Sequence, residues 1–358
     1  MMQMEYITLD KISENLDSKR KPITSSDRVE GKIPYYGASG IVDYVKDYIF
    51  DESLLLVSED GANLLARSTP IAFSVTGKTW INNHAHVLRF SNENLQKFVE
   101  IYLNSISLES YVTGSAQPKL NQKMLNGIPI PVVDDSQIEI IVNSVENLKS
   151  IIEFRKQELA CLDDLIKARF VEMFGSIYDN KYGYNVMTLQ DVCEPIKDGT
   201  HQTPTYTEDT VNGFKFLSSK DVTSGKVDWD HLKYIPEELH NELYKRISPR
   251  KGDILLAKNG TTGVAAIVDR DEVFDIYVSL ALLKPLEMVT AEYLCSAVNS
   301  LETKHQFDHS LKGIGVPNLH LGEIKKTKII VPPIELQKQF ADFVHQVDKS
   351  KVVVASVK

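Results

Sequence analysis

The sequence has few cysteines and no long apolar run. Its three cysteines, Cys161, Cys193 and Cys295, are widely separated and form no Cys-x-x-Cys pair, which excludes a disulfide scaffold and a cysteine-rich zinc site. No apolar run approaches the roughly 20 residues that a membrane helix needs. The first residues show neither the apolar segment nor the cleavage site of a signal peptide. We therefore expect a cytoplasmic protein with no membrane partner.

The chain also lacks an excess of positive charge. Its net charge is −9 and no basic tail or arm is present. Because general affinity for nucleic acid comes from Lys and Arg neutralising phosphates, a non-specific polyanion binder is disfavoured. DNA binding then requires that positive charge be concentrated locally.

Motifs for nucleotide binding and methyl transfer are incomplete. Residues 77–79, Gly-Lys-Thr, look like the end of a phosphate-binding loop, but Ala72 stands where the first glycine is required. The Gly-x-Gly at 313–315 lacks a third glycine, and no Asn/Asp-Pro-Pro-Tyr/Phe sequence occurs. A methyltransferase core that binds S-adenosylmethionine is therefore missing.

Nuclease and metal-binding patterns are also incomplete. Asp253 and Lys258 are placed on a strand as nuclease residues are, but Ala257 stands in place of the second metal-binding acid. His84 and His86 could bind a metal if both faced one side of a strand, but no third ligand is evident. We expect no enzymatic activity, no metal and no cofactor in this chain.

The chain contains an internal repeat. At 358 residues it is too long for one ordinary core, and two periods are too few for a solenoid. The matched pairs are Thr8-Leu9 with Thr188-Leu189, Pro118 with Pro317, and Gln137 with Gln337. The repeat predicts four segments: a first domain at 1–135, a long helix at 136–175, a second domain at 176–333 and a C-terminal helix at 334–358.

A heptad pattern runs through the first long helix. It begins after the candidate N-cap residues 134–136 and ends at Gly175. Its positions are Ile138, Ile141, Val145, Leu148, Ile152, Arg155, Leu159, Leu162, Ile166, Arg169 and Met173. The C-terminal helix has the same spacing at Leu336, Phe340, Phe343, Val347, Ser350, Val354 and Val357. We expect an antiparallel coiled coil; the alternative is that each stripe packs on its own domain.

The two globular segments look mixed α/β. Short apolar runs between Gly, Asn and Asp turns predict strands, and longer periodic runs predict one helix in each domain. The expected strands are 48–50, 53–57, 70–75, 85–90, 214–217, 253–257 and 264–268, and the expected helices are 93–111 and 290–307. The fold class is thus two similar α/β domains separated by long helices.

Polar loops rich in Asn, Gln, Lys, Ser, Thr and Gly occur in both domains. Such side chains make phosphate and base-edge contacts, and glycine lets the backbone approach a duplex; any one of these loops could equally be a solvated turn. The candidates in the first domain are Lys19, Arg20, Lys21, Tyr35, Tyr36, Asn63, Lys78, Asn82, Asn83 and His84. Those in the second are Lys197, Thr200, His201, Gln202, Thr203, Lys220, Lys258, Asn259, Thr261 and Thr262.

Several of these segments resemble the specificity subunit of type I restriction-modification systems. They are IPYYGA (33–38), NNHAHVL (82–88), DGTHQTP (198–204), GDILLAKNGTTG (252–263) and the helix ending KARFVEMFG (167–175). The resemblance covers essentially the whole chain, although the C-terminal helix lacks the KARFVEMFG-like ending.

The resemblance implies a non-catalytic subunit that binds double-stranded DNA, with each domain recognising one half of a bipartite target. It implies that the helices dock two methyltransferase subunits, through residues such as Arg155, Arg169, Phe170 and Phe174, and that translocase/endonuclease subunits join them. S-adenosylmethionine, ATP and magnesium are then used by the partners. The alternatives are a coiled-coil adaptor with two protein-binding domains and no DNA role, and the recognition part of a fused restriction enzyme.

Overall fold

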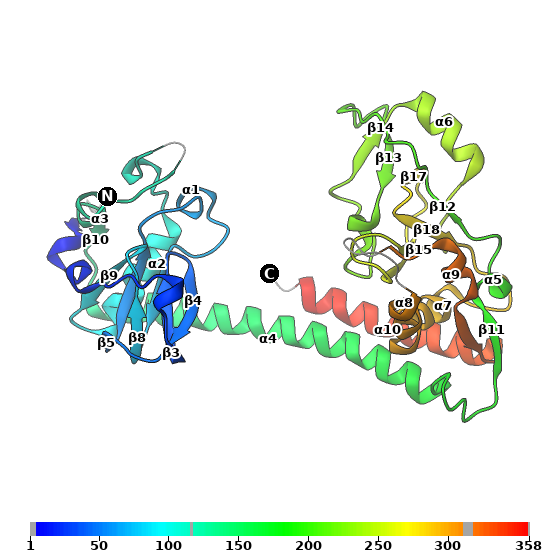
Figure 1. The fold of residues 1–358 in the computed structure, drawn as a ribbon, viewed down its shortest axis with the longest axis horizontal. Helices are drawn as coiled ribbons and strands as arrows, with labels where there is room; N and C mark the ends of the chain where they lie inside the picture. Colours follow the sequence, from blue (N-terminus) through cyan, green and yellow to red (C-terminus); the bar gives the residue numbers. More distant parts are fainter. Residues whose placement is uncertain (1–4, 115–116, 311–317, 357–358) are drawn as a thin grey trace. The chain divides into compact units, whose positions relative to one another are not determined.

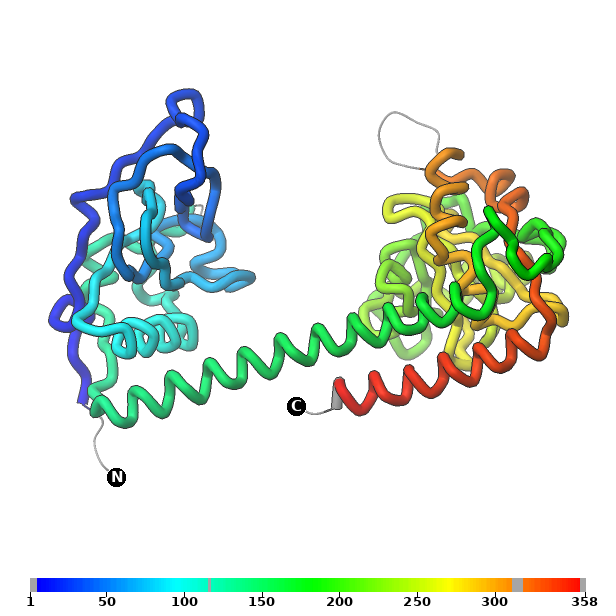
Figure 2. Tube along the Cα trace, turned by 90° about the horizontal axis from the view of Figure 1, so that it is seen from below, coloured from blue at the N-terminus to red at the C-terminus, as the bar shows by residue number. Residues whose placement is uncertain are grey.

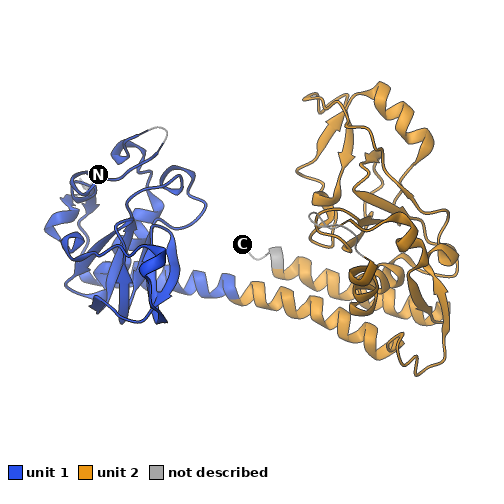
Figure 3. Cartoon of the chain, viewed as in Figure 1, with its two compact units in different colours: residues 1–153 blue, residues 154–358 orange. Residues whose placement is uncertain are grey.

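The computed structural model describes residues 5–114, 117–310 and 318–356 (Figure 1). Two compact units divide the chain, Met1–Glu153 and Phe154–Lys358 (Figure 3). The division falls inside the long helix, so the four-segment organisation at 1–135, 136–175, 176–333 and 334–358 stays a prediction. The sequence features at 313–315, Pro317 and Val357 lie outside the described residues.

Unit 1 contains two four-stranded sheets and a short antiparallel strand pair. The sheets have the strand orders β2-β9-β6-β7 and β4-β3-β8-β5, and β1 pairs with β10. The strands are β1 (Tyr6–Thr8), β2 (Ser13–Asn15), β3 (Glu30–Gly37), β4 (Gly40–Val45), β5 (Phe50–Asp51), β6 (Leu54–Ser58), β7 (Ala72–Val75), β8 (Lys78–Ile81), β9 (Ala85–Phe90) and β10 (Pro129–Pro131). The helices are α1 (Asn63–Ala66), α2 (Glu93–Ser105) and α3 (Gln122–Asn126), with 3-10 turns at Leu9–Lys11, Asp17–Lys19, Ser25–Asp27 and Glu109–Tyr111.

Unit 2 repeats this plan. Its sheets have the orders β12-β18-β15-β16 and β14-β13-β17, and β11 pairs with β19. The strands are β11 (Asn185–Thr188), β12 (Lys197–Asp198), β13 (Phe214–Leu217), β14 (Lys233–Ile235), β15 (Ile254–Ala257), β16 (Ala265–Ile267), β17 (Phe274–Ile276), β18 (Leu280–Leu283) and β19 (Lys328–Val331). The helices are α5 (Leu189–Val192), α6 (Glu237–Arg246), α7 (Ala291–Val298), α8 (Leu301–Ser310), α9 (Leu321–Lys326) and α10 (Ile334–Ser356), with a 3-10 turn at Ser219–Val222.

The central strands of both units are buried along their whole length and almost entirely apolar. All five residues of β6 and all four of β15 are buried, as expected of strands covered on both faces. In each unit this strand lies between two antiparallel neighbours, β7 and β9 or β16 and β18. The second sheet of each unit contains one parallel pair, β3 with β8 or β13 with β17. The internal repeat therefore corresponds to a repeated architecture.

The helix predicted at 290–307 is wrong as a single element, because the chain breaks between α7 and α8. The side chain of Asn299 donates to the Ala265 carbonyl and accepts from the Ala265 N–H, which ties the break to β16. Ser300 then accepts from the Thr303 N–H and starts α8. In unit 1, the predicted helix 93–111 likewise ends at Ser105 and is followed by a 3-10 turn.

The long helix α4 spans Asp135–Phe174. Asp134 caps it by accepting the Gln137 N–H at 2.9 Å, and Gly175 ends it with φ +74°, a left-handed conformation that favours glycine. Its first turns enter the unit 1 core through Ile138 and Val142. The predicted N-cap and C-terminal glycine are both confirmed.

The second half of α4 packs antiparallel to α10 within unit 2 (Figure 2). Phe170 and Phe174 contact Phe340 near the start of α10, at ring-centroid distances of 5.6 and 5.4 Å. Asp163, earlier in α4, forms an ion pair at 2.7 Å with Lys351, later in α10. The end of α4 therefore lies beside the start of α10, and an earlier part of α4 lies beside a later part of α10. This agrees with the predicted antiparallel pair.

Candidate nucleic-acid interface

Three segments of unit 1 meet beside the end of β8 and form what we call the unit 1 loop cluster: residues 17–21, 59–60 and 82–84. Arg20 joins them, because its guanidinium contacts the Glu59 carboxylate at 2.6 Å and the carbonyl oxygens of Asn83 and Ala85. The Glu59 N–H donates to the His84 carbonyl at 2.9 Å. The sequence-predicted segments around Lys19 and Asn82 are therefore neighbours in the fold.

The unit 2 loop cluster contains the segments 198–203 and 258–262, which correspond to 17–21 and 59–60, and also the segment 218–220, which follows β13. All three contact the short segment 277–279 that precedes β18. Thr200 forms a parallel bridge with Tyr277, the Ser219 N–H donates to the Ser279 hydroxyl at 2.9 Å, and the Lys258 N–H donates to the Ser279 carbonyl at 2.9 Å. The two clusters thus occupy matching places in the repeat.

Many of the predicted site residues are exposed on these clusters. Their side chains are free to approach a ligand from outside the unit, as phosphate and base contacts require. The exposed set is Lys19, Lys21, Asn83 and His84 in unit 1, and Lys197, His201, Gln202, Thr203, Lys220 and Thr261 in unit 2.

Other predicted site residues are buried or half-buried and make contacts within the unit, and their contact with DNA stays a prediction. Tyr35 is 1% exposed, and its hydroxyl accepts the Ile23 N–H. The Asn82 amide oxygen accepts the His84 N–H. Arg20 and Lys258 lie in ion pairs described below, and Thr200 is 7% exposed.

Tyr36, Asn63, Asn259 and Thr262 are half-buried. Tyr36 packs against Phe73 at a ring-centroid distance of 6.1 Å, and burial, together with Tyr44, raises the pKa of its hydroxyl. Asn63 accepts the Thr69 N–H and so closes the turn after α1. The Asn259 amide oxygen is buried and has no hydrogen-bond partner among the residues that the structure describes.

Lys78 does not belong to the unit 1 loop cluster. It begins β8, whereas Asn82 and Asn83 follow the end of that strand. Its ammonium lies over the ring of Tyr48, 4.7 Å from the centroid. Lys78 therefore lies apart from the other unit 1 candidates, and its contact with DNA stays a prediction.

Two residues that the sequence interpretation missed also lie at the clusters. Lys119 reaches Glu59 at 3.1 Å and bridges Asp60 through the backbone. Tyr277 of unit 2 and Asn82 of unit 1 are equivalent positions. The Tyr277 N–H donates to the Leu217 carbonyl at the end of β13, and the Asn82 N–H donates to the Tyr36 carbonyl near the end of β3. The repeat offset could have found Tyr277, since Asn82 was already a candidate.

Neighbouring basic side chains lower the pKa values of three carboxylates beneath the clusters. Burial opposes ionisation of Asp17, but the hydrogen bond and charge of His86, the Val87 N–H and Arg20 hold its pKa below the usual range. The pKa of Asp198 is lowered in the same way by Lys258 and His201, against the effect of burial. The pKa of Glu59 is also lowered, despite burial, by Arg20, His86 and Lys119.

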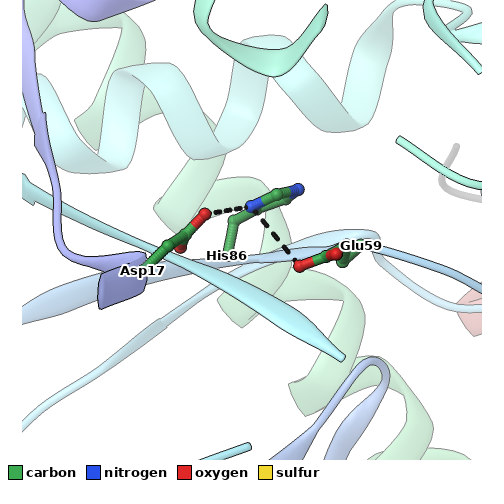
Figure 4. A group of neighbouring side chains, drawn as sticks. All are labelled: Asp17, Glu59 and His86. Atoms are coloured by element: carbon green, nitrogen blue, oxygen red, sulfur yellow. Dashed lines mark hydrogen bonds and ion pairs between the residues drawn. The ribbon is translucent and has the colours of Figure 1, made fainter. Parts of the chain in front are cut away.

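Asp17, Glu59 and His86 form a compact group whose atoms lie close enough to hold a metal ion (Figure 4). Their polar atoms are already engaged, however. His86 Nδ1 faces the Asp17 carboxylate at 2.6 Å and Nε2 faces the Leu120 carbonyl at 2.7 Å, so both ring nitrogens already have partners within the protein. The group therefore fits an internal charge network better than a metal site.

The predicted partner-binding residues differ in exposure. Phe170 and Phe174 are 7% and 0% exposed and pack on Tyr293 in the unit 2 core, and their contact with a partner stays a prediction. Arg155 pairs with Glu158, and Arg169 lies over Phe343. Of the KARFVEMFG residues, Arg169, Phe170 and Phe174 thus contact other residues of unit 2.

Exposed apolar side chains lie instead in the middle of α4. Four of them are more than half exposed: Leu148, Ile151, Ile152 and Phe154. Val352 on α10 is also exposed. In the part of the chain that the structure describes, no helix has the length and apolar character needed to cross a membrane.

The sequence model of a protein family, the type I restriction modification DNA specificity domain, matches this chain twice, at residues 1–163 and 181–353. A putative type I restriction enzyme specificity subunit of Haemophilus influenzae is 28% identical over 99% of this chain and 89% of its own length. The MjaVIII specificity subunit of Methanocaldococcus jannaschii is 22% identical over 96% of this chain and 86% of its own length.

Solved structures have the same fold at low sequence identity. The S subunit of a type I restriction-modification system from M. genitalium matches with a TM-score of 0.56 at 14% identity, over 99% of this chain and 91% of that one. A chain of a type I R-M system, studied for complex assembly and conformational transition, matches with a TM-score of 0.58 at 14% identity, over 99% and 92%. With both repeats matched over most of the sequence, the chain belongs to the type I restriction modification DNA specificity domain family.

Proposed function

We propose that this protein is the DNA-binding specificity subunit of a type I restriction-modification complex and that each unit recognises one half of a bipartite target. The observation that carries the proposal is the double family match, one to each unit, combined with a separate loop cluster in each. The subunit is non-catalytic, and DNA recognition is its contribution to the complex.

The side chains exposed on the clusters suit duplex recognition. Lysines neutralise phosphates or bind guanine, and Asn and Gln amides form paired hydrogen bonds with adenine. In unit 2 these roles fall to Lys197, Gln202 and Lys220, and in unit 1 to Lys19, Lys21 and Asn83. Because the net charge is −9, we infer that non-specific DNA affinity is supplied largely by partner subunits.

We further propose that two methyltransferase subunits dock on the helices and that translocase/endonuclease subunits join the assembly in the cytoplasm. The partners then use S-adenosylmethionine, ATP and magnesium. The apolar side chains of Leu148, Ile151, Ile152 and Phe154 support α4 as the docking element, because exposed apolar patches mark sites of protein association. We therefore propose these four exposed side chains, and not the buried Phe170 and Phe174, as the docking residues.

Mapping methylated bases in a host that carries this protein and its methyltransferase tests the DNA role. We expect methylation at one bipartite sequence. Replacing Lys197, His201, Gln202 and Lys220 together with Ala should relax one half-site, with each lost base contact costing about 1–3 kcal/mol, and should leave the other half-site unchanged. Replacing Lys19, Lys21 and Asn83 should relax the opposite half-site.

A matched control removes two exposed cations of unit 2 that lie away from the cluster. Lys251 precedes β15, whereas the cluster residues follow its end, and Arg270 follows β16 near the same edge. Replacing both with Ala should change neither half-site. Equal relaxation of both half-sites by a cluster variant would refute two independent readers. Absence of duplex binding with the methyltransferase present would favour the adaptor alternative.

Co-purification tests the docking proposal. Replacing Leu148 and Phe154 with Ala should reduce recovery of the methyltransferase, since both side chains are more than half exposed. Ile140, 64% exposed nearer the start of α4, provides the control, and its replacement should leave recovery unchanged. Undiminished recovery with the first variant would place the docking site elsewhere.

A further inference from the structure

Asp17 and Asp198 hold the same place in the two repeats. Asp198 ends β12 and Asp17 follows β2 by two residues; β2 and β12 are the edge strands of their four-stranded sheets, and the first segment of each loop cluster begins at the aspartate. Asp198 is paired in register with Ala281 of β18. The β2 register, which pairs Asn15 with Leu88, places Asp17 opposite His86 of β9. His86 and Ala281 are therefore equivalent positions.

Glu59 and Lys258 are equivalent as well, because their backbones make the same two hydrogen bonds. In each case the N–H donates to a carbonyl just before the next sheet strand, and the carbonyl accepts a leucine N–H. The donor-to-acceptor pairs are Glu59 to His84 and Leu120 to Glu59 in unit 1, and Lys258 to Ser279 and Leu319 to Lys258 in unit 2, at 2.8–2.9 Å.

The side chains at these equivalent places differ, but both units supply a buried basic side chain to the aspartate. In unit 2, Lys258 is 7% exposed and reaches Asp198 at 2.7 Å. In unit 1, position 59 is an acid, and the basic partner is His86, 1% exposed and 2.6 Å from Asp17 (Figure 4). A second basic side chain lies three residues after each aspartate: Arg20 at 3.4 Å and His201 at 3.4 Å.

The basic side chain that pairs with the aspartate therefore comes from a different part of the sheet in each repeat, whereas the aspartate and its pairing are common to both. A bare acid pair at positions 17 and 59 would be strongly unfavourable when buried, so an acid at position 59 requires cations nearby. Arg20, His86 and Lys119 all lie within 4 Å of the Glu59 carboxylate. The feature common to the two units is therefore a paired carboxylate at the first residue of the first loop segment.

We propose that Asp17 and Asp198 are positioning residues that orient the first loop of each cluster, residues 17–21 and 198–203, for DNA recognition. This inference rests on the proposed function. Each aspartate fixes a loop that carries exposed side chains, Lys19 and Lys21 or His201 and Gln202, and recognition needs those side chains held in one geometry. Asp17 and Asp198 do not themselves face the ligand.

The test uses the complex of this chain with its methyltransferase and measures methylation of cognate and singly mismatched targets. Asp198→Asn should lower discrimination at one half-site about tenfold, comparable to the loss of one base contact, and leave the other half-site intact. Asp17→Asn should do the same at the opposite half-site. Asp198→Glu, which keeps the charge for Lys258, should retain more discrimination than Asp198→Asn.

The matched control is Asp253→Asn, which breaks another ion pair of the same sheet, with Lys284 at 2.6 Å, at the strand end away from the cluster. It should lower the melting temperature without changing discrimination. Asp198→Asn behaving like this control, or Glu and Asn variants behaving alike, would overturn the inference. Wild-type complex that methylates no bipartite sequence would instead overturn the proposed function.

Discussion

Replacing Phe174 with Ala should strongly destabilise unit 2. Phe174 is fully buried and contacts Phe170, Tyr293 and Phe340 at ring-centroid distances of 5.1, 4.9 and 5.4 Å. Removing a buried Phe ring costs about 3–5 kcal/mol, and three ring contacts place this site toward the upper end. With a urea dependence of about 2 kcal/mol per molar, the unfolding midpoint of unit 2 should fall by roughly 2 M.

Hydrogen exchange measured by mass spectrometry along the urea series separates the two units. Peptides of unit 2 should lose protection at lower urea, whereas those of unit 1 should not change. Phe154→Ala is the control on the same helix, because a side chain that is 67% exposed should cost under about 0.5 kcal/mol. An unchanged midpoint for the Phe174 variant would refute the anchoring of α4 in the unit 2 core.

Three further predictions concern the helix end, the charge network and the helix length. Gly175→Ala should cost about 1 kcal/mol in urea unfolding because φ is +74°, while the added Cβ would meet the side chains of Lys181 at 3.4 Å and Tyr182 at 3.7 Å, both ordinary contacts. The folded-state pKa of Asp17 is lowered, so its contribution to the stability of unit 1 is present above the unfolded pKa of about 3.9 and is lost as the pH falls toward the folded pKa. Between about pH 5 and 2, hydrogen-exchange protection of unit 1 should therefore fall less steeply in Asp17→Asn than in the wild type. Inserting four residues after Ile152 should lengthen α4 by about 6 Å and the spacer between half-sites by one to two base pairs, with unchanged half-site bases in the methylome.

The long helix could be predicted from the sequence because its signals are local. Asp134 and Gly175 mark its ends, and the apolar period marks one face. The period does not reveal that Phe170 and Phe174 lie beside this face and pack on the unit 2 core, because their partner Tyr293 is far away in the sequence. A helix with two packing partners has more than one row of apolar side chains, and periodicity identifies only the more regular row.

The candidate site was predictable at the level of loops but not of individual side chains. Glycines and polar residues identify the segments around residues 20, 83, 201 and 259. Whether a lysine or arginine in such a loop is exposed depends on carboxylates that only the fold brings near. Arg20 meets Glu59 and Lys258 meets Asp198, pairs separated by 39 and 60 residues. Lys19 and Lys197 have no such buried carboxylate and stay exposed.

The middle of α4 has a consequence for how such genes can be rearranged. Ile138 and Val142 belong to the core of unit 1, and Phe170 and Phe174 to the core of unit 2, whereas Leu148 and Ile152 are exposed. A recombination crossover within the codons of this segment would join half of one gene to half of another without splitting either core. New combinations of target halves could therefore arise by exchange of whole units, with no need to redesign either hydrophobic interior.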